Sequence, residues 1–360
     1  MKTLAIIGAS YLQQPVVEKA KEMGLRTICF AWPQGAVCKD ICDTFYPISI
    51  TEKEEILRIC QSEHIDGICT IASDVAAPTV AYVAEQMRLP GNRYQAALIA
   101  HDKHLMREAL VKAGVDCPKY VVLNKNRAAG RISYFDKISL LHLQLPLIVK
   151  PTDRSGSLAV TKVTKWDDLE AAVTEAERVS IAGEAMVEEF IEGQEISVEF
   201  ISQNGQHHAL QITDKTTTGA PHFVELAHHQ PSSLPAVMQE RIYAITRRAL
   251  DALGLTEGAS HSEYKITSSG RIVVMEIAGR MGGDFIGSDL VQLSTGYDFL
   301  RGVIEVALGE PIEVKVEPLA RSSVQFIAPQ ELTCSADRTG YIIYKNDEIY
   351  KQSIGSDTDL

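Results

Sequence analysis

Two glutamates on either side of a tight turn constrain this chain more than any other feature. Residues 261–284 are typical of two short strands joined by a two-residue Ser-Gly turn. Such a turn pairs Ile266 with Val273, and the same register sets Glu263 directly opposite Glu276. Opposed side chains have Cβ atoms roughly 4.5–5.5 Å apart, so two carboxylates there repel unless a positive charge lies between them. The pattern predicts a divalent cation at this hairpin.

Hard oxygen ligands in a pair favour Mg²⁺ or Mn²⁺, which keep positions open for water and substrate phosphates. The alternative is a solvated hairpin whose acids point into water. Arg280 follows the second acid closely, and Gly282 with Gly283 lets the backbone bend towards an anion and offer N–H groups to it. Together these residues predict one compact site for a nucleotide and its metal ion.

Composition sets the broad class. A length of 360 residues indicates two or three domains, and a net charge of −12 argues against a nucleic-acid partner. The seven cysteines are scattered without a Cys-x-x-Cys pair, which is typical of a reducing compartment. No apolar run is long enough for a signal peptide or a membrane span. We therefore expect a soluble, cytoplasmic protein that does not bind a membrane.

The chain opens with a strand, helix and strand pattern, in which residues 3–8 and 26–30 are the apolar runs. The spaced glycines of a dinucleotide site are missing after the first strand, which argues against a dehydrogenase. Residues up to about 95 are predicted to form an open α/β domain. Ser73 and Asp74 follow one of its strands, where they either contact a substrate or cap a helix.

Three further segments carry polar residues that could bind phosphates or sugar. Residues 145–151 form an apolar strand that places Lys150 at its end, and a Ser-Gly-Ser loop follows at 155–157. From Glu195 to Phe200, glutamate and serine alternate with apolar residues, which predicts a half-buried strand with acids on one face. Either Glu195 binds a ligand or that face is only solvated.

Residues 214–233 show no periodicity and are predicted to form a long loop that covers or builds a site. His228 and His229 lie within it. Neighbouring residues on an extended chain point in opposite directions, so the two histidines make a poor metal pair. His228 is a candidate substrate contact, with a packing role as the alternative.

Taken in order, these signals resemble the ATP-grasp superfamily from the first strand to about residue 330. Asp102-Lys103 matches the first ATP-binding lysine of that superfamily, and Lys150 before a proline matches the second. Ser155, Gly156 and Ser157 resemble the loop that closes over the β- and γ-phosphates. The resemblance therefore implies that both lysines and the loop bind ATP.

The segment from Val187 to Glu195 is similar to the hinge between the two grasping lobes. That similarity implies that Glu188, with the backbones of Glu189 and Ile191, holds adenine. It also implies that Glu195 accepts hydrogen bonds from the ribose hydroxyls.

The two acids of the hairpin, Glu263 and Glu276, match the superfamily's Mg²⁺ ligands, and Arg280 matches the catalytic arginine that meets the transferred phosphate and the acyl phosphate. The superfamily often has asparagine two residues after the second acid, where this chain has Ala278. Water or a phosphate oxygen then completes the metal shell, or metal binding is weaker than in relatives.

The implied fold class is α/β, becoming α+β in the central part. An N-terminal open α/β domain precedes a two-lobed ATP-grasp domain and a small C-terminal β region. The expected boundaries are 1–95 for the N-terminal domain, 96–185 and 186–310 for the two lobes, and 311–360 for the C-terminal region.

Within the superfamily, residues 223–232 and 276–284 look most like carboxylate–amine ligases such as amino-acid or dipeptide ligases. The resemblance implies an ATP-dependent enzyme that makes an acyl phosphate from a small carboxylate and couples it to an amine. Ser73, Asp74, His228, Arg280, Gly282 and Gly283 are the candidate substrate contacts. Alternatives are a bicarbonate-dependent carboxylase acting through carboxyphosphate and a catalytically silent ATP-binding protein. A homodimer is also expected.

Overall fold

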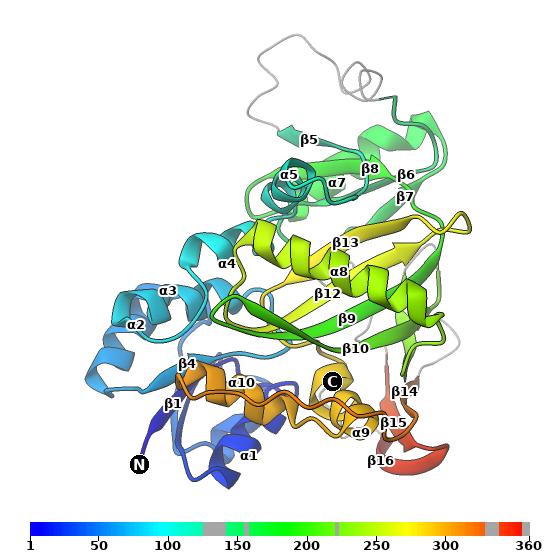
Figure 1. The fold of residues 1–360 in the computed structure, drawn as a ribbon. Helices are drawn as coiled ribbons and strands as arrows, with labels where there is room; N and C mark the ends of the chain where they lie inside the picture. Colours follow the sequence, from blue (N-terminus) through cyan, green and yellow to red (C-terminus); the bar gives the residue numbers. More distant parts are fainter. Residues whose placement is uncertain (125–141, 155–157, 220–222, 328–337, 355–360) are drawn as a thin grey trace.

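The protein has a mixed α/β architecture built on three sheets (Figure 1). The computed structural model describes residues 1–124, 142–154, 158–219, 223–327 and 338–354. The predicted fold class is confirmed by this arrangement. No helix in the described ranges combines the length and the apolar character that crossing a bilayer requires.

The first sheet is parallel, with strand order β3-β2-β1-β4. All five residues of β1 are buried. Its alternate residues pack into two different apolar clusters, one on each face of the sheet, because helices cover both faces. The elements of this unit are β1 (Thr3–Ile7), α1 (Gln14–Glu22), β2 (Arg26–Phe30), η1 (Val37–Asp40), β3 (Thr44–Tyr46), α2 (Lys53–Ser62), β4 (Gly67–Cys69) and α3 (Ala77–Met87).

Two helices, α4 (Tyr94–His101) and α5 (Lys103–Lys112), lead from this unit into a second, antiparallel sheet. Asp102 caps α5 by accepting a hydrogen bond from the Leu105 N–H at 2.9 Å. The sheet has the order β5-β8-β6-β7, and α7 packs on one of its faces. Its elements are β5 (Tyr120–Asn124), β6 (Leu147–Pro151), β7 (Thr161–Val163), η3 (Trp166–Asp168), α7 (Leu169–Val179) and β8 (Glu184–Glu189).

The third sheet has eight strands in the order β13-β12-β9-β10-β11-β14-β15-β16. The long helix α8 lies across one face of it, as Figure 1 shows, and residues of both form one apolar cluster. The elements are β9 (Gln194–Gln203), β10 (Gln206–Thr217), β11 (Glu225–Gln230), α8 (Ala236–Leu253), β12 (Gly258–Ile266), β13 (Ile272–Ala278), η4 (Ile286–Leu290), α9 (Val291–Thr295), α10 (Phe299–Ala307), β14 (Ser322–Ile327), β15 (Gly340–Lys345) and β16 (Glu348–Ile354).

The register of the hairpin at 261–284 differs from the prediction near its turn. Ile266 pairs with Ile272, one residue before the expected partner Val273. A β-bulge then shifts the register between Glu263 and Tyr264, and Glu263 pairs with Glu276 after all. The prediction that Glu263 and Glu276 oppose each other is therefore correct. The opposition arises from a bulge combined with a turn longer than the two residues predicted.

The prediction of one long loop at 214–233 is wrong. Residues up to Thr217 complete β10, and β11 begins at Glu225 and pairs with it antiparallel. The polar residues of these strands hide the alternation, because both faces of β10 and β11 carry polar side chains that pair inside the protein. His228 is fully buried and His229 is exposed, so the two do point apart as expected.

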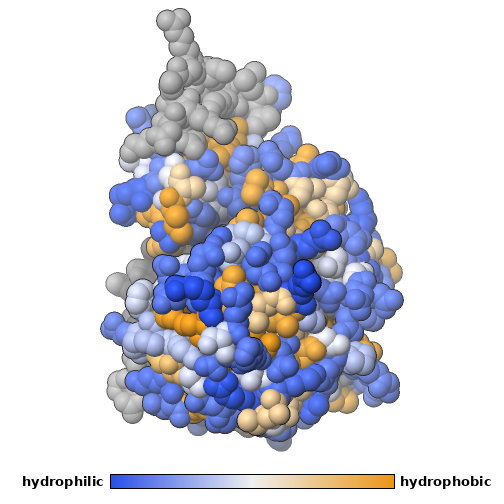
Figure 2. Space-filling model, turned by 90° about the vertical axis from the view of Figure 1, so that its left-hand side faces the viewer, coloured by the Kyte–Doolittle hydropathy of each residue, from blue (hydrophilic) through white to orange (hydrophobic). Residues whose placement is uncertain are grey.

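Figure 2 shows one outer side of the molecule. Its surface is mostly hydrophilic, and hydrophobic residues occur there in small separate patches. No extended apolar face is visible on this side.

Candidate active site

A cavity of ≈ 700 Å³ lies where the three sheets meet. That volume lies within the usual range for small-molecule sites of about 300–1,000 Å³. The N-terminal unit, the four-stranded sheet and the eight-stranded sheet all contribute to its wall. The lining residues that the sequence had singled out are Asp74, Lys103, Lys150, Glu188, Ile191, Glu195, Glu263, Glu276, Ala278, Arg280 and Gly283.

The floor of the cavity is the face of the eight-stranded sheet that lies opposite α8. Strand pairing places side chains there in rows across β9, β12 and β13. Glu263 lies between Ser197 and Glu276 in one row. His261 lies between Glu199 and Ala278 in the neighbouring row. The period of two along each strand therefore gathers acids on one face while Val198 and Phe200 pack under α8.

Each of the two opposed acids already has a lysine beside it. Lys103 Nζ lies 3.1 Å from Glu276 Oε1, and Lys215 Nζ lies 2.8 Å from Glu263 Oε1. Burial raises the pKa of Glu263, but Lys215 and His261 outweigh it and hold that pKa well below its usual value. Glu263 is therefore ionised at neutral pH, and two charged oxygen donors face one space, a donor set that suits Mg²⁺ or Mn²⁺.

Lys150 is held by a buried carboxylate from the hinge. Its ammonium pairs with Glu188, which is 1% exposed and also accepts from Arg107 Nη2 at 3.3 Å. Burial lowers the pKa of Lys150, and Glu188 only partly offsets this. Burial raises the pKa of Glu188, yet Lys150 and Arg107 bring it below its ordinary value. Glu188 thus fixes the position of the Lys150 side chain at the wall of the cavity.

Arg280 crosses from the end of β13 to the N-terminal unit. Its guanidinium donates to both oxygens of Asp74, at 2.7 and 2.9 Å. Asp74 was interpreted as either a substrate contact or a helix cap; the N-cap residue of α3 is Ala76 instead. Ser73 is beside it in the chain but is not among the residues that line the cavity. Asp74 therefore fixes the direction of Arg280.

The two glycines after Arg280 differ in whether they can bind an anion. The Gly282 N–H donates to Glu199 Oε2 at 2.9 Å, so the expectation that it is available to an anion is wrong. Gly283 lines the cavity and retains that possibility. Residues 155–157, the expected phosphate loop, lie outside the described residues.

The hinge residues divide between the cavity and the surface. Ile191 and Glu195 line the cavity, and Glu195 Oε2 lies 3.3 Å from Lys265 Nζ. The side chain of Glu189 instead points to Arg271, at 3.1 Å. Because the Glu189 N–H also donates to the Lys119 carbonyl oxygen at 3.0 Å, the backbone group left for a ligand is its carbonyl.

Several charged residues of the cavity were missed by the sequence interpretation. Lys215 contacts Glu195, Glu225 and Glu263 at once, and these acids raise its pKa well above its usual value despite its burial. Polar residues at every second position of β10 (Gln211, Thr213, Lys215) were the signal that could have identified it. Lys215 thus adds a buried lysine to the end of the cavity that holds Glu263.

A second acidic group lies beyond Lys215. Ligand atoms of Glu225, His228 and Asp284 lie within 4.8 Å of one another. His228 Nε2 is 3.1 Å from Glu225 Oε2, and both Asp284 oxygens accept from Arg338 at 2.9 and 3.0 Å. Burial lowers the pKa of His228, but Glu225 and Asp284 outweigh it and raise that pKa. Glu225 and His228 belong to β11, which β9 and β10 separate from β12, and Lys215 lies between this group and Glu263.

Three comparisons with known proteins agree with this geometry. Residues 143–289 match the family model described as the ATP-grasp domain. The chain is 31% identical over 255 residues to alanine–anticapsin ligase of Bacillus subtilis (strain 168), covering 64% of this chain and 51% of that protein. The chain spans about half the length of the first curated relatives it matches.

Two solved structures are similar along almost the whole chain. An L-amino acid ligase from Bacillus licheniformis has a TM-score of 0.76 and 26% sequence identity, covering 92% of this chain and 81% of that one. A phosphoribosylglycinamide synthetase from Anaerococcus prevotii has a TM-score of 0.77 and 22% identity, covering 96% and 94%. The second likeness, at its low identity, concerns the fold alone.

Proposed function

The chain contains an ATP-grasp domain, and from this premise we propose that it is an ATP-dependent carboxylate–amine ligase. The proposal has the γ-phosphoryl group of ATP move to a carboxylate oxygen, with ADP leaving. The acyl phosphate then reacts with an amine, which forms a C–N bond and releases phosphate. The observation that carries the proposal is the opposed pair of Glu263 and Glu276 with a lysine beside each.

The proposed role of each charged residue follows from its charge and position. Lys103 and Lys150 are placed to neutralise the phosphates, and Glu263 with Glu276 would hold Mg²⁺ or Mn²⁺. The ion, when bound, would supply positive charge to the phosphoryl group during its transfer. Arg280, held by Asp74, would meet the oxygens of the acyl phosphate. Such positioning and charge neutralisation account for most phosphoryl-transfer catalysis, so no side-chain nucleophile is needed.

The adenosine is assigned to the hinge. The backbones of Glu189 and Ile191 would bond adenine, and Glu195 would accept from the ribose. Because the Glu188 carboxylate is committed to Lys150 and Arg107, its contribution is to hold that lysine as well as to shape the base pocket.

For the acid we favour an amino acid. Glu225 and Asp284 line the cavity, and the ammonium ion of an amino acid would pair with them by displacing their present cationic partners. Arg338 already occupies both oxygens of Asp284, which leaves too few free oxygens for a complete metal shell. An L-amino acid ligase and an alanine–anticapsin ligase are among the similar proteins, which supports the same substrate class. The cytoplasmic location and the homodimer stay predictions.

The test is Mg²⁺-dependent ADP formation with amino acids supplied singly and in pairs, and with bicarbonate added or omitted. We expect one acid and amine pair to stimulate ADP formation, and the analogue of the acid that lacks its α-amino group to stimulate far less. A requirement for bicarbonate alone would indicate the carboxylase instead. ATP binding without ADP formation in any mixture would indicate a silent nucleotide-binding protein.

A further inference from the structure

A buried carboxylate beneath the metal acids has no part in the roles above. Glu199 lies in the middle of β9 with 0% of its surface exposed. It faces the cavity side of the sheet, in the row next to the one that holds Glu263. An ionised carboxylate in the interior costs several kcal/mol unless its oxygens are paired. The partners of its two oxygens therefore indicate which groups it positions.

Both oxygens of Glu199 are used, and by different segments. Oε1 bonds Nδ1 of His261, and Oε2 accepts the Gly282 N–H at 2.9 Å. The other ring nitrogen of His261 lies 3.4 Å from Glu263 Oε1. One carboxylate thus reaches the metal acid through an imidazole and reaches the Arg280 segment through a backbone N–H.

The close approach at Gly282 depends on the absence of a side chain. A Cβ added there would lie 2.6 Å from Glu199 Oε1 and 2.8 Å from His261 Nδ1. No ordinary non-bonded contact is that short, so any other residue would separate the three groups. The glycine that the sequence interpretation assigned to anion binding is instead needed to close this contact.

We propose that Glu199 is a positioning residue of the ligase reaction, a proposal that rests on the proposed function. Through His261 it fixes the carboxylate of Glu263 towards the metal, and through Gly282 it fixes the turn that carries Arg280. Groups that bond the ligands of a metal orient those ligands, and losing one typically costs roughly 10–100-fold in metal affinity or activity. Here His261 bonds the proposed ligand Glu263, and Glu199 orients His261.

The position of Glu199 predicts which steps depend on it. The residues assigned to adenine and the second lysine belong to β8, the hinge and β6, and Glu195, assigned to the ribose, lies at the start of β9. None of the described contacts of Glu199 reaches them. Loss of Glu199 should therefore weaken metal binding and slow turnover while nucleotide affinity stays nearly constant. A residue that only stabilised the fold would not produce this separation.

The experiment compares the wild-type chain with Glu199→Gln. An amide can accept at one oxygen only, and its NH₂ group would face either His261 or the Gly282 N–H. We expect Mn²⁺ binding in the presence of ADP, measured by electron paramagnetic resonance, to weaken about 10-fold or more. With ATP and the acid and amine pair that the substrate screen selects, kcat should fall by a similar factor while KM for ATP changes less than about 3-fold.

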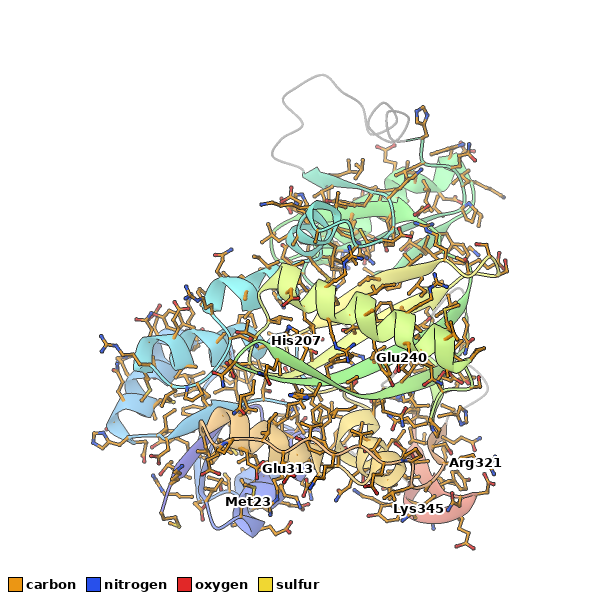
Figure 3. The ribbon with its side chains drawn as sticks, in the orientation of Figure 1. Met23, His207, Glu240, Glu313, Arg321 and Lys345 are labelled. Atoms are coloured by element: carbon orange, nitrogen blue, oxygen red, sulfur yellow. The ribbon has the colours of Figure 1, made fainter. Side chains whose placement is uncertain are left out.

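Ser202→Ala is the matched control. Ser202 is also buried on β9 and bonds a histidine, His207 Nδ1, at 2.7 Å, but on the α8 face of the sheet (His207 is labelled in Figure 3). This variant should lose stability without changing Mn²⁺ binding. Equal changes in the two variants, or less than about a 2-fold change in Glu199→Gln, would overturn the proposal.

A second variant covers the case in which the amide does not fold. Glu199→Asp keeps the charge but shortens the reach, so it should fold and show a smaller defect of the same kind. If neither variant folds, Glu199 is a structural residue and the proposal is wrong. Mn²⁺ binding needs no amino acid, so a wild-type chain that binds Mn²⁺ with ADP but makes no product refutes the proposed function and still leaves Glu199 testable.

Discussion

At the scale of single residues, the site consists of cations and carboxylates that neutralise one another in the absence of ligands. Lys103 pairs with Glu276 and Lys215 with Glu263, so each metal acid carries a lysine at the place where a metal ion would sit. Binding of Mg²⁺ with ATP would have to displace these ammonium groups, and the phosphates would then accept them. Until the nucleotide binds, these ion pairs offset the free-energy cost of removing the charged groups from water.

Replacing the second metal acid tests that arrangement. Glu276→Gln should lower Mg²⁺-dependent ADP formation by at least about a hundredfold, because the neutral amide is a poor ligand for a hard cation. The fold should survive, since Lys103 keeps its hydrogen bond to the Arg154 carbonyl oxygen at 2.7 Å and the hairpin keeps its strand pairing. Steady-state rates over a Mg²⁺ series measure the effect, and circular dichroism checks folding. Unchanged activity would refute the metal assignment.

Removing the second lysine tests the phosphate assignment. Lys150→Ala should weaken ATP binding by about 1.5–3 kcal/mol, the usual value of a hydrogen bond to a charged group. Glu188 keeps Arg107 as a partner at 3.3 Å, so the buried carboxylate is not left alone. Isothermal titration gives the dissociation constant, with Lys162→Ala, a lysine stacked on Phe190, as a control for loss of charge nearby. Equal affinity in Lys150→Ala and wild type would count against the role.

The residues show how far sequence reasoning reaches. Glu263 and Glu276 could be identified because they are close in the chain and the period of a strand is two. Lys150 could be identified because an apolar run ends in a lysine before a proline. Lys215, Glu199 and Arg338 were not assigned, because their partners are on strands or loops that are distant in sequence. Such contacts follow from strand order, which local patterns do not encode.

At the scale of elements, the link between β8 and β9 joins the four-stranded sheet to the eight-stranded sheet. Gly193 lies in this link against the end of β12. A Cβ at Gly193 would lie 2.3 Å from the Ile266 carbonyl oxygen, which is backbone and cannot move alone. The glycine therefore sets how closely the hinge approaches the hairpin that carries the metal acids.

Gly193→Ala should destabilise the protein by about 1–3 kcal/mol, the usual effect of forcing extra volume into a packed place. It should also weaken ATP binding, because the hinge and the metal acids would no longer be aligned. Gly24→Ala is the control, since nothing lies within 4 Å of a Cβ there and only its φ of +74° is unfavourable. Thermal unfolding and nucleotide titration measure both. An effect on stability alone in Gly193→Ala would contradict the alignment argument.

The elements were predicted unevenly for a physical reason. The strands of the N-terminal sheet are apolar throughout because both faces are covered, so their sequence signal is strong. The strands β10 and β11 were predicted as a loop because their buried face is lined by paired polar groups. Internal charge pairs remove the apolar alternation by which a strand is usually identified.

At the scale of the whole molecule, the ion pairs make stability depend on pH. Burial lowers the pKa of His261, but Glu199 and Glu263 outweigh it and raise that pKa to about 9. The folded chain therefore binds this proton more tightly than the unfolded chain. The resulting stabilisation is complete below the ordinary histidine value of about 6.5 and is lost as the pH rises towards 9.

We expect the unfolding free energy of the ligand-free protein to fall by up to about 3 kcal/mol between pH 6.5 and pH 9 through this group. His261→Asn should remove most of that dependence, whatever its stability at pH 6.5. Urea unfolding at a series of pH values measures the slope for each protein. Parallel slopes in wild type and variant would show that His261 does not carry the charge.

The most direct test of the ligase mechanism follows the carboxylate oxygen. The amino acid that best stimulates ADP formation is supplied with ¹⁸O in its carboxylate, together with ATP, Mg²⁺ and the amine, and the released phosphate is analysed by mass spectrometry. An acyl phosphate transfers one ¹⁸O to phosphate for every C–N bond formed, and that is the result we predict. Phosphate that carries no ¹⁸O while the product accumulates would contradict the account, because the carboxylate would then not have been phosphorylated.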